Sequence, residues 1–311
     1  MPAYIDPKIP DRLDQLDDYL AKAETRLPSL RKGCEKKIVW FRGRRQRREL
    51  AIVYVHGFSA SRMETWPLCD QLAAALGANL FYTRLTGHGQ DGLSMASARV
   101  EDWLADGMQA IAVGRRLGEA VVLIGTSTGG TLVTWLAAQP SVAAPIHSLI
   151  LLAPNFMPKN PLALVMLWPP GLRFCEHLFG GWRCFTALNT DQSRYWTVRY
   201  PLRAIATMMQ LVRLSWRIDL KAAAMPVLMM INPWDRVVNV SLAVYRFSHF
   251  ASAHKKRVWF RENRDMGRHV LAGNILSPQS TPKALAIMLA FIRNIPTVRG
   301  TIDDITHRKE G

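Results

Sequence analysis

The stretch Val121-Val122-Leu123-Ile124-Gly125-Thr126-Ser127-Thr128-Gly129-Gly130 decides the fold class of this chain. Its apolar, β-branched beginning predicts a buried strand, and the apolar residues 131–138 that follow it predict a helix. The G-x-S-x-G pattern between them is typical of a sharp strand-to-helix turn that exposes a serine hydroxyl. By itself the pentapeptide is weak evidence for such a turn, because about one chain of this length in ten contains it by chance. The flanking strand and helix make it informative.

Outward from this turn, apolar strand candidates alternate with amphipathic helix candidates. The strand candidates cover residues 50–55, 79–84, 120–125, 148–153, 226–232 and 256–261. The helix candidates cover residues 64–76, 100–117, 130–138, 240–250 and 282–294. Strands that are apolar throughout and separated by helices predict an α/β fold with a mostly parallel, doubly wound sheet that is covered on both faces.

One interval breaks this alternation. Residues 155–224 contain no strand candidate of similar quality, so we expect a mainly helical lid inserted between residues 50–154 and 225–298 of the core. Residues 1–49 would lead into the core, and residues 299–311 would form a C-terminal tail. The interval is rich in large apolar side chains and in basic residues. Such a surface suits a lipid-like or aromatic acyl group, although clusters of this kind also simply pack on themselves.

The N-terminal region predicts one helix and two strands. Apolar residues at helical spacing predict a helix within residues 10–27. The basic cluster Arg42-Gly43-Arg44-Arg45-Gln46-Arg47-Arg48 lies between strand candidates 37–41 and 50–55. We expect this cluster to form the solvated tip of a β-hairpin, with an acidic partner or an anionic membrane surface as the alternative explanation.

Composition limits the remaining classes of protein. The 311 residues are 49% hydrophobic, which is enough for a large core, and the formal net charge is +16. The basic cluster has no interleaved aromatic residues, so we expect no nucleic-acid partner. No secretory signal is recognisable, and the apolar run 162–168 is far shorter than the roughly 20 residues of a membrane span, so we expect a cytoplasmic protein. The four cysteines lack metal-ligand spacing, and we expect neither metal nor cofactor. The oligomeric state stays open.

Three polar residues each follow a strand candidate, in the chain order Ser127, Asp235, His269. A serine hydroxyl becomes a good nucleophile when an imidazole takes its proton and an acid orients that imidazole. Asp235 follows the strand candidate 226–232, and His269 follows the strand candidate 256–261. Because the carboxyl ends of parallel strands share one edge of the sheet, we expect both side chains near Ser127.

Other residues compete for two of these roles. Asp265 and Glu262 lie closer to His269 in the sequence than the predicted acid does, so each is an alternative acid. His88, in Gly87-His88-Gly89, is an alternative base, although a histidine in such a turn more often braces its loop. We interpret His56 likewise as a structural residue that braces its turn.

Five segments together carry a family resemblance. They are Val55-His56-Gly57-Phe58, Thr86-Gly87-His88-Gly89, the turn at 125–129, Pro233-Trp234-Asp235-Arg236-Val237-Val238 and Arg268-His269-Val270. Over about residues 50–295 the chain resembles the α/β-hydrolase superfamily, and within it the monoglyceride lipase and carboxylesterase branch, whose chain order is serine, acid, histidine. The resemblance implies that Ser127 is the nucleophile, His269 the general base and then acid, and Asp235 the orienting carboxylate.

The resemblance also implies an oxyanion hole made by the backbone N–H groups of Phe58 and Thr128. It implies a serine hydrolase that cleaves an ester with an apolar acyl group, such as a monoglyceride or lysophospholipid, through an acyl-enzyme intermediate. Acyl transfer, or hydrolysis of an amide or a carbon–carbon bond, would use the same residues and stays open. A non-catalytic binder of this fold is the remote alternative. The basic residues of the expected lid favour peripheral contact with an anionic membrane.

Overall fold

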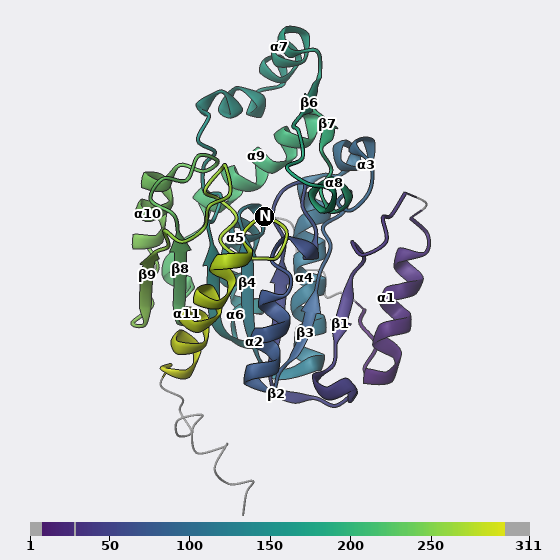
Figure 1. Cartoon of the computed structure of the whole chain (residues 1–311), viewed down its shortest axis with the longest axis vertical. Coiled ribbons are helices and arrows are strands. Elements are labelled where there is room, and N and C mark those ends of the chain that lie inside the picture. Colours follow the sequence, from purple (N-terminus) through teal and green to yellow (C-terminus); the bar gives the residue numbers. More distant parts are fainter. Residues whose placement is uncertain (1–7, 28, 296–311) are drawn as a thin grey trace, which may run out of the picture.

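A computed structural model describes residues 8–27 and 29–295 of the chain. Its main sheet contains β1 Lys37–Val39, β2 Arg48–Val55, β3 Asn79–Tyr82, β4 Gly118–Thr126, β5 Ile146–Leu152, β8 Val227–Ile231 and β9 Lys255–Trp259. The strand order is β1-β3-β2-β4-β5-β8-β9, and only the pairing of β1 with β3 is antiparallel among these described strands (Figure 1). The predicted α/β fold with a mostly parallel sheet is therefore confirmed. The predicted tail, residues 299–311, lies outside the described residues.

Helices cover both faces of the sheet, as Figure 1 shows. The main ones are α2 Leu68–Leu76, α4 Val100–Leu117, α5 Thr128–Ala137 and α11 Thr281–Arg293. Val121 and Leu123 of β4 pack into the layer that contains α4 and α5. Val122 and Ile124 point the other way, into the layer that contains α2 and α11. Because successive side chains of a strand point to opposite faces, one strand stabilises two layers. Full burial of each such side chain contributes about 1.5–3 kcal/mol.

Four further helices flank the described part of the core. They are α1 Leu16–Glu24, α3 Gly92–Ser97, α6 Pro140–Ala143 and α10 Val240–Ser248. The predicted leading helix is thus present as α1, but it occupies only the middle of residues 10–27. It ends where Glu24 turns inward to pair with Arg84 at 2.9 Å.

The basic cluster does not form the tip of a hairpin. β2 is hydrogen-bonded to β3 on one side and to β4 on the other, so it has no free edge for β1, which pairs with β3 instead. The connection between β1 and β2 therefore crosses the end of β3. There the Asn79 side chain accepts a hydrogen bond from the Phe41 N–H at 3.0 Å and donates one to the Gln46 carbonyl at 2.8 Å. Residues 42–47 are exposed, as expected.

Between the neighbouring strands β5 and β8, the chain leaves the core over residues 155–224. This insertion contains α7 Pro169–Phe179, β6 Trp182–Cys184, α8 Thr190–Tyr195, β7 Arg199–Pro201, α9 Leu202–Arg217 and the 3₁₀ segments Pro161–Leu167 and Leu220–Ala222. In Figure 1 the insertion caps the upper end of the sheet, with α7 farthest from it. Met208 and Met209 of α9 are buried in the layer that contains α5, which attaches the insertion to the core. The small β6–β7 sheet was not predicted, because three-residue strands are too short to show alternation.

Candidate active site

Ser127 occupies a strained turn at the carboxyl end of β4. Its φ of 51° and ψ of −115° are unusual for a residue that carries a side chain. The flanking glycines make the turn possible, because a Cβ on Gly125 would lie 2.5 Å from the Gly129 carbonyl oxygen. A Cβ on Gly129 would lie 2.1 Å from the Val55 carbonyl oxygen. The spacing of G-x-S-x-G therefore reflects close packing of strand, turn and helix around the serine.

His269 and Asp235 meet at the ends of β9 and β8. The Nδ1 atom of His269 lies 2.7 Å from Asp235 Oδ2. The other oxygen of Asp235 accepts the backbone N–H groups of Val237 at 2.7 Å and Val238 at 2.9 Å, so the carboxylate is fixed from both sides. With Nδ1–H donating to the carboxylate, Nε2 of His269 carries a lone pair that can accept a proton.

The two competing acids have other partners. Asp265 accepts the backbone N–H of His269 at 3.0 Å and the side-chain amide of Asn263 at 2.8 Å, so it holds the loop and not the imidazole. Glu262 forms an ion pair with Lys283 at 2.8 Å. The structure therefore brings only Asp235, of the three acids considered, to the ring of His269.

His88, the competing base, and His56 are both fully buried at the loop after β2. Nδ1 of His56 lies 2.9 Å from the Gly57 carbonyl oxygen, and its Nε2 accepts the Leu85 N–H at 3.1 Å. Burial lowers the pKa of His56 to about 4. Burial, together with the nearby His56, also keeps the pKa of His88 well below its ordinary value. Both rings therefore stay neutral and brace the loop.

The pKa of His269 changes in the opposite direction. Burial alone would lower it, but Asp235, Glu64 and Asp265 together raise the pKa of His269 above its ordinary value. The imidazole is thus surrounded by groups that favour its protonated form. A base that receives a proton from a serine benefits from this arrangement, because the imidazolium forms during the reaction.

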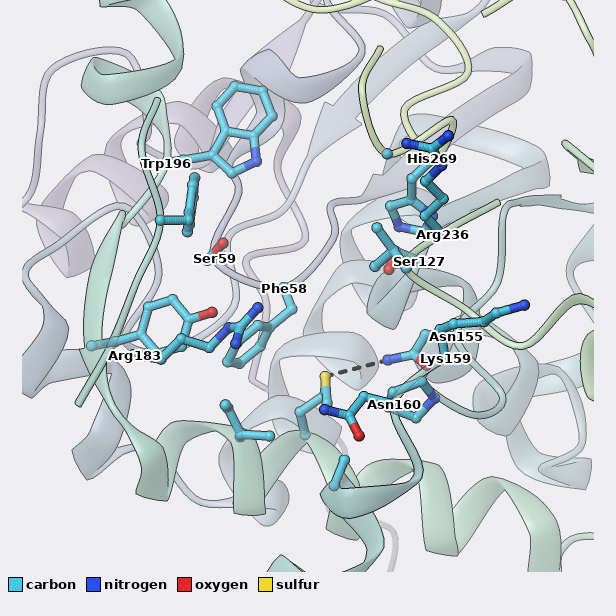
Figure 2. Close-up of a pocket in the computed structure, with 18 of the residues that line it drawn as sticks. Phe58, Ser59, Ser127, Asn155, Lys159, Asn160, Arg183, Trp196, Arg236 and His269 are labelled. Carbon is cyan, nitrogen blue, oxygen red and sulfur yellow. Dashed lines mark hydrogen bonds between the residues drawn. The ribbon is translucent and has the colours of Figure 1, made fainter. Parts of the chain in front are cut away.

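Ser127 and His269 line the same cavity, which has a volume of about 720 Å³. Figure 2 shows both on one wall, with Phe58 and Arg183 across from them. No hydrogen bond joins Ser127 Oγ to Nε2 of His269 in this conformation; the ring bonds through Nδ1 to Asp235. Such contacts are often long in ligand-free hydrolases and shorten when substrate binds.

The two N–H groups predicted to form an oxyanion hole belong to Thr128, which follows Ser127 in the chain, and to Phe58, which lines the same cavity as Ser127. Thr128 is the first residue of α5, and its N–H belongs to the positive end of that helix. Phe58 lies in the loop after β2 and lines the cavity. Among the described residues, neither N–H is paired with an acceptor. Both are therefore available to an oxygen atom of a bound molecule.

The wall of the cavity is mainly apolar and comes largely from the insertion. The apolar side chains that the insertion contributes include Leu162, Met166, Phe179, Trp182, Phe185, Trp196 and Met208. Lys159, Arg183 and Arg236 add positive charge, and Figure 2 shows the guanidinium of Arg183 directed into the cavity and the amine of Lys159 turned away from it. Within the described ranges, no group of three or more His, Cys, Asp or Glu residues is arranged to hold a metal ion.

The chain belongs to the α/β hydrolase family, whose sequence profile matches residues 52–285. A search of curated proteins finds no match to the sequence. In the part of the chain that the structure describes, the helices fall short of the length and apolarity that crossing a bilayer requires.

Solved structures show the same fold at low sequence identity. A structure from work on LipS and LipT, two metagenome-derived lipolytic enzymes, is 20% identical, with a TM-score of 0.71 over 86% of this chain and 100% of that one. A soluble variant of monoglyceride lipase from Saccharomyces cerevisiae, in complex with a substrate analogue, is 14% identical, with a TM-score of 0.63 over 83% and 90%. Monoacylglycerol lipase from Paleococcus ferrophilus is 15% identical, with a TM-score of 0.60 over 83% and 97%.

Proposed function

We propose that this protein is a serine hydrolase that cleaves carboxylic esters with an apolar acyl group. One observation carries the proposal: Ser127, on its strained turn, and His269, which is hydrogen-bonded to the buried Asp235, line one mainly apolar cavity. The lipolytic enzymes that share the fold support this class of reaction. A monoglyceride or a lysophospholipid has the required chemistry, namely an ester with one long acyl chain.

The proposed reaction proceeds in two halves. Nε2 of His269 takes the hydroxyl proton of Ser127 while Oγ forms a bond to the carbonyl carbon of the ester. The N–H groups of Phe58 and Thr128 stabilise the resulting oxyanion, and the C–O bond to the alcohol then breaks as His269 returns the proton to it. Water, deprotonated by His269, then attacks the acyl carbon on Ser127. The bond from that carbon to Ser127 Oγ breaks as His269 returns the proton to Oγ, and the carboxylic acid is released. Asp235 holds the imidazole in the required tautomer throughout.

We propose that the insertion acts as a lid that holds the acyl chain. Its apolar side chains form most of the cavity wall, and α9 attaches it to the core beside α5. An apolar wall of this kind removes water from the reacting ester, which strengthens the hydrogen bonds to the oxyanion. The length of the cavity then decides which acyl chains fit.

The outer side of the same insertion supports a second proposal, peripheral contact with an anionic membrane. Large apolar side chains are exposed there, among them Trp168 at 65%, Phe174 at 62% and Leu178 at 58%. Apolar groups of this kind can enter the headgroup region, and nearby basic residues add attraction to anionic lipids. In this arrangement a lipid ester would reach the cavity directly from the membrane.

A fluorophosphonate probe tests the catalytic proposal, because it phosphonylates only a serine that an adjacent base activates. We expect labelling of the wild-type protein at Ser127 and none of the S127A variant. Hydrolysis of p-nitrophenyl esters of increasing chain length, again with S127A as the control, would then define the acyl group. A folded wild-type protein that is neither labelled nor hydrolytic would refute the proposed function.

A further inference from the structure

Glu64 is a buried carboxyl group in the wall of the cavity. It ends the short 3₁₀ segment Arg62–Glu64 in the loop after β2, and it is 3% exposed. It lines the same cavity as Ser127. A glutamate is rarely buried to this extent unless other groups compensate for its loss of water. Its hydrogen-bond partners therefore indicate why it is there.

One carboxyl oxygen of Glu64 holds the loop that carries a proposed oxyanion donor. Oε2 accepts the backbone N–H of Gly57 at 2.8 Å and the hydroxyl of Tyr54 at 3.0 Å. Gly57 directly precedes Phe58, whose N–H is proposed to bind the oxyanion. The bond from Gly57 therefore fixes the His56–Gly57 peptide, which directly precedes the Gly57–Phe58 peptide that carries Phe58 N–H.

The same oxygen also reaches the turn of the nucleophile through Tyr54. The Tyr54 hydroxyl lies 3.0 Å from Thr126 Oγ1 as well as from Glu64 Oε2, and Thr126 directly precedes Ser127. The chain of hydrogen bonds thus runs from the end of β4 through β2 to the oxyanion loop. Both segments that carry proposed oxyanion donors are connected through one carboxyl group.

The second oxygen of Glu64 faces the reacting serine. The point that a Cβ on Gly57 would occupy lies 2.8 Å from Glu64 Oε1 and 3.3 Å from Ser127 Cβ, so the two side chains flank the same point. Within the described ranges, Oε1 has no hydrogen-bond donor. Glu64 also contributes to the raised pKa of His269, whereas burial raises the pKa of Glu64 itself.

We propose that Glu64 is a positioning residue for the reaction: Oε2 fixes the oxyanion loop, and the negative charge stabilises the imidazolium of His269. This inference rests on the proposed serine hydrolase function. From the loops after β8 and β9, Asp235 bonds the imidazole of His269, Asp265 bonds its backbone N–H and adds a nearby negative charge, and Arg236 lines the cavity. Glu64 is the carboxyl group that acts from the side of β2 and the oxyanion loop.

The E64Q variant separates this role from packing, because glutamine keeps the shape and an acceptor for Gly57 N–H but loses the charge. We expect kcat to fall about tenfold with KM unchanged within about twofold. We also expect the acid limb of the pH profile of kcat/KM to move to lower pH, because loss of the carboxylate lowers the pKa of His269. The matched control is E262Q, which removes the same charge from the Glu262–Lys283 ion pair outside the cavity and should leave the acid limb in place.

A second variant keeps the inference open to refutation if E64Q does not fold. E64D retains the charge but withdraws the carboxyl group by one methylene, so kcat should fall while the acid limb stays in place. Wild-type kcat and an unmoved acid limb in a folded E64Q protein would overturn the proposal, as would wild-type kcat in E64D. Fluorophosphonate labelling of the wild-type Ser127 in the same experiment shows whether the failure concerns Glu64 alone or the serine hydrolase function itself.

Discussion

The carboxylate of Asp235 and the imidazole of His269 meet at 2.7 Å although they lie 34 positions apart in the chain. The parallel pairing of β8 with β9 produces this meeting, because both residues lie in loops that leave the same edge of the sheet. Asp235 is only 2% exposed, so water weakens the contact little. The pair therefore controls both the tautomer and the charge of the proposed base.

The first prediction concerns D235N, which removes this charge with little change in shape. We expect kcat to fall about 10³-fold or more, because asparagine can present its amide to Nδ1 and favour the wrong tautomer of His269. Asp235 is among the groups that raise the pKa of His269. Its loss should lower that pKa, so the residual activity should persist to lower pH than in the wild type. A pH profile of kcat/KM measures both effects.

The control for this prediction is D265N. Asp265 bonds the backbone of His269 and not its ring, so the loss of kcat should be much smaller than in D235N. An equal or larger loss in D265N would contradict the assignment of Asp235 as the orienting acid.

The second prediction concerns His88, the alternative base. Its Nε2 is buried without a hydrogen-bond partner among the described residues, and its ring packs against Phe58 and Trp103. Phenylalanine should therefore replace it well, because the change removes an unsatisfied polar atom. We expect H88F to keep kcat within about threefold of the wild type and to change the free energy of unfolding by less than about 1.5 kcal/mol.

Ester hydrolysis and thermal unfolding measure the two effects in H88F. H269Q, measured in parallel, should lose nearly all activity, because its side chain cannot accept and return a proton. If H88F loses as much activity as H269Q, the structural role of His88 is wrong.

Much of the core could be predicted from the sequence because local patterns determine it. The apolar runs of β4 and β5 have few alternatives to burial in a sheet, and Gly125 has a steric cause that operates within five residues, because it packs against Gly129. The positions of Asp235 and His269 follow from parallel topology, which brings loop residues to one edge. For these features, a short segment and one topological rule are sufficient.

Other features depend on contacts that no local pattern records. The pairing of β1 with β3 depends on which strand edges are free, and that is settled only after the whole sheet forms. Glu64 lies at the start of the helix candidate 64–76, and no local sequence pattern marks it as a residue that contacts the preceding strand and loop. Its carboxyl group contacts Tyr54 at the end of β2 and Gly57 in the loop that follows. These contacts exist only in the folded chain, so no local pattern predicts them.

The third prediction concerns the acyl chain. Ile205 of α9 is half-buried and lines the cavity, so tryptophan at this position should shorten the space for a substrate. We expect I205W to lower kcat/KM for long-chain p-nitrophenyl esters about tenfold or more while the acetate ester reacts at the wild-type rate. The control is L93W, because Leu93 is 64% exposed on α3, outside this cavity. A uniform loss for all chain lengths in I205W would contradict the acyl-chain assignment.

The last prediction concerns the outer face of α7, where Phe174 and Leu178 lie one turn apart and are both mostly exposed. If this face enters the headgroup region of a membrane, the double variant F174S/L178S should bind anionic vesicles about tenfold more weakly, because it loses two apolar anchors. Cosedimentation with phosphatidylglycerol vesicles measures the binding, and L93S serves as the control with an equally exposed leucine elsewhere. Wild-type binding should also weaken in pure phosphatidylcholine and in high salt, because the basic residues of the insertion contribute through long-range attraction. Equal binding to neutral and anionic vesicles would refute the proposed electrostatic attraction. Unchanged binding of the double variant would refute the proposed contact between α7 and the membrane.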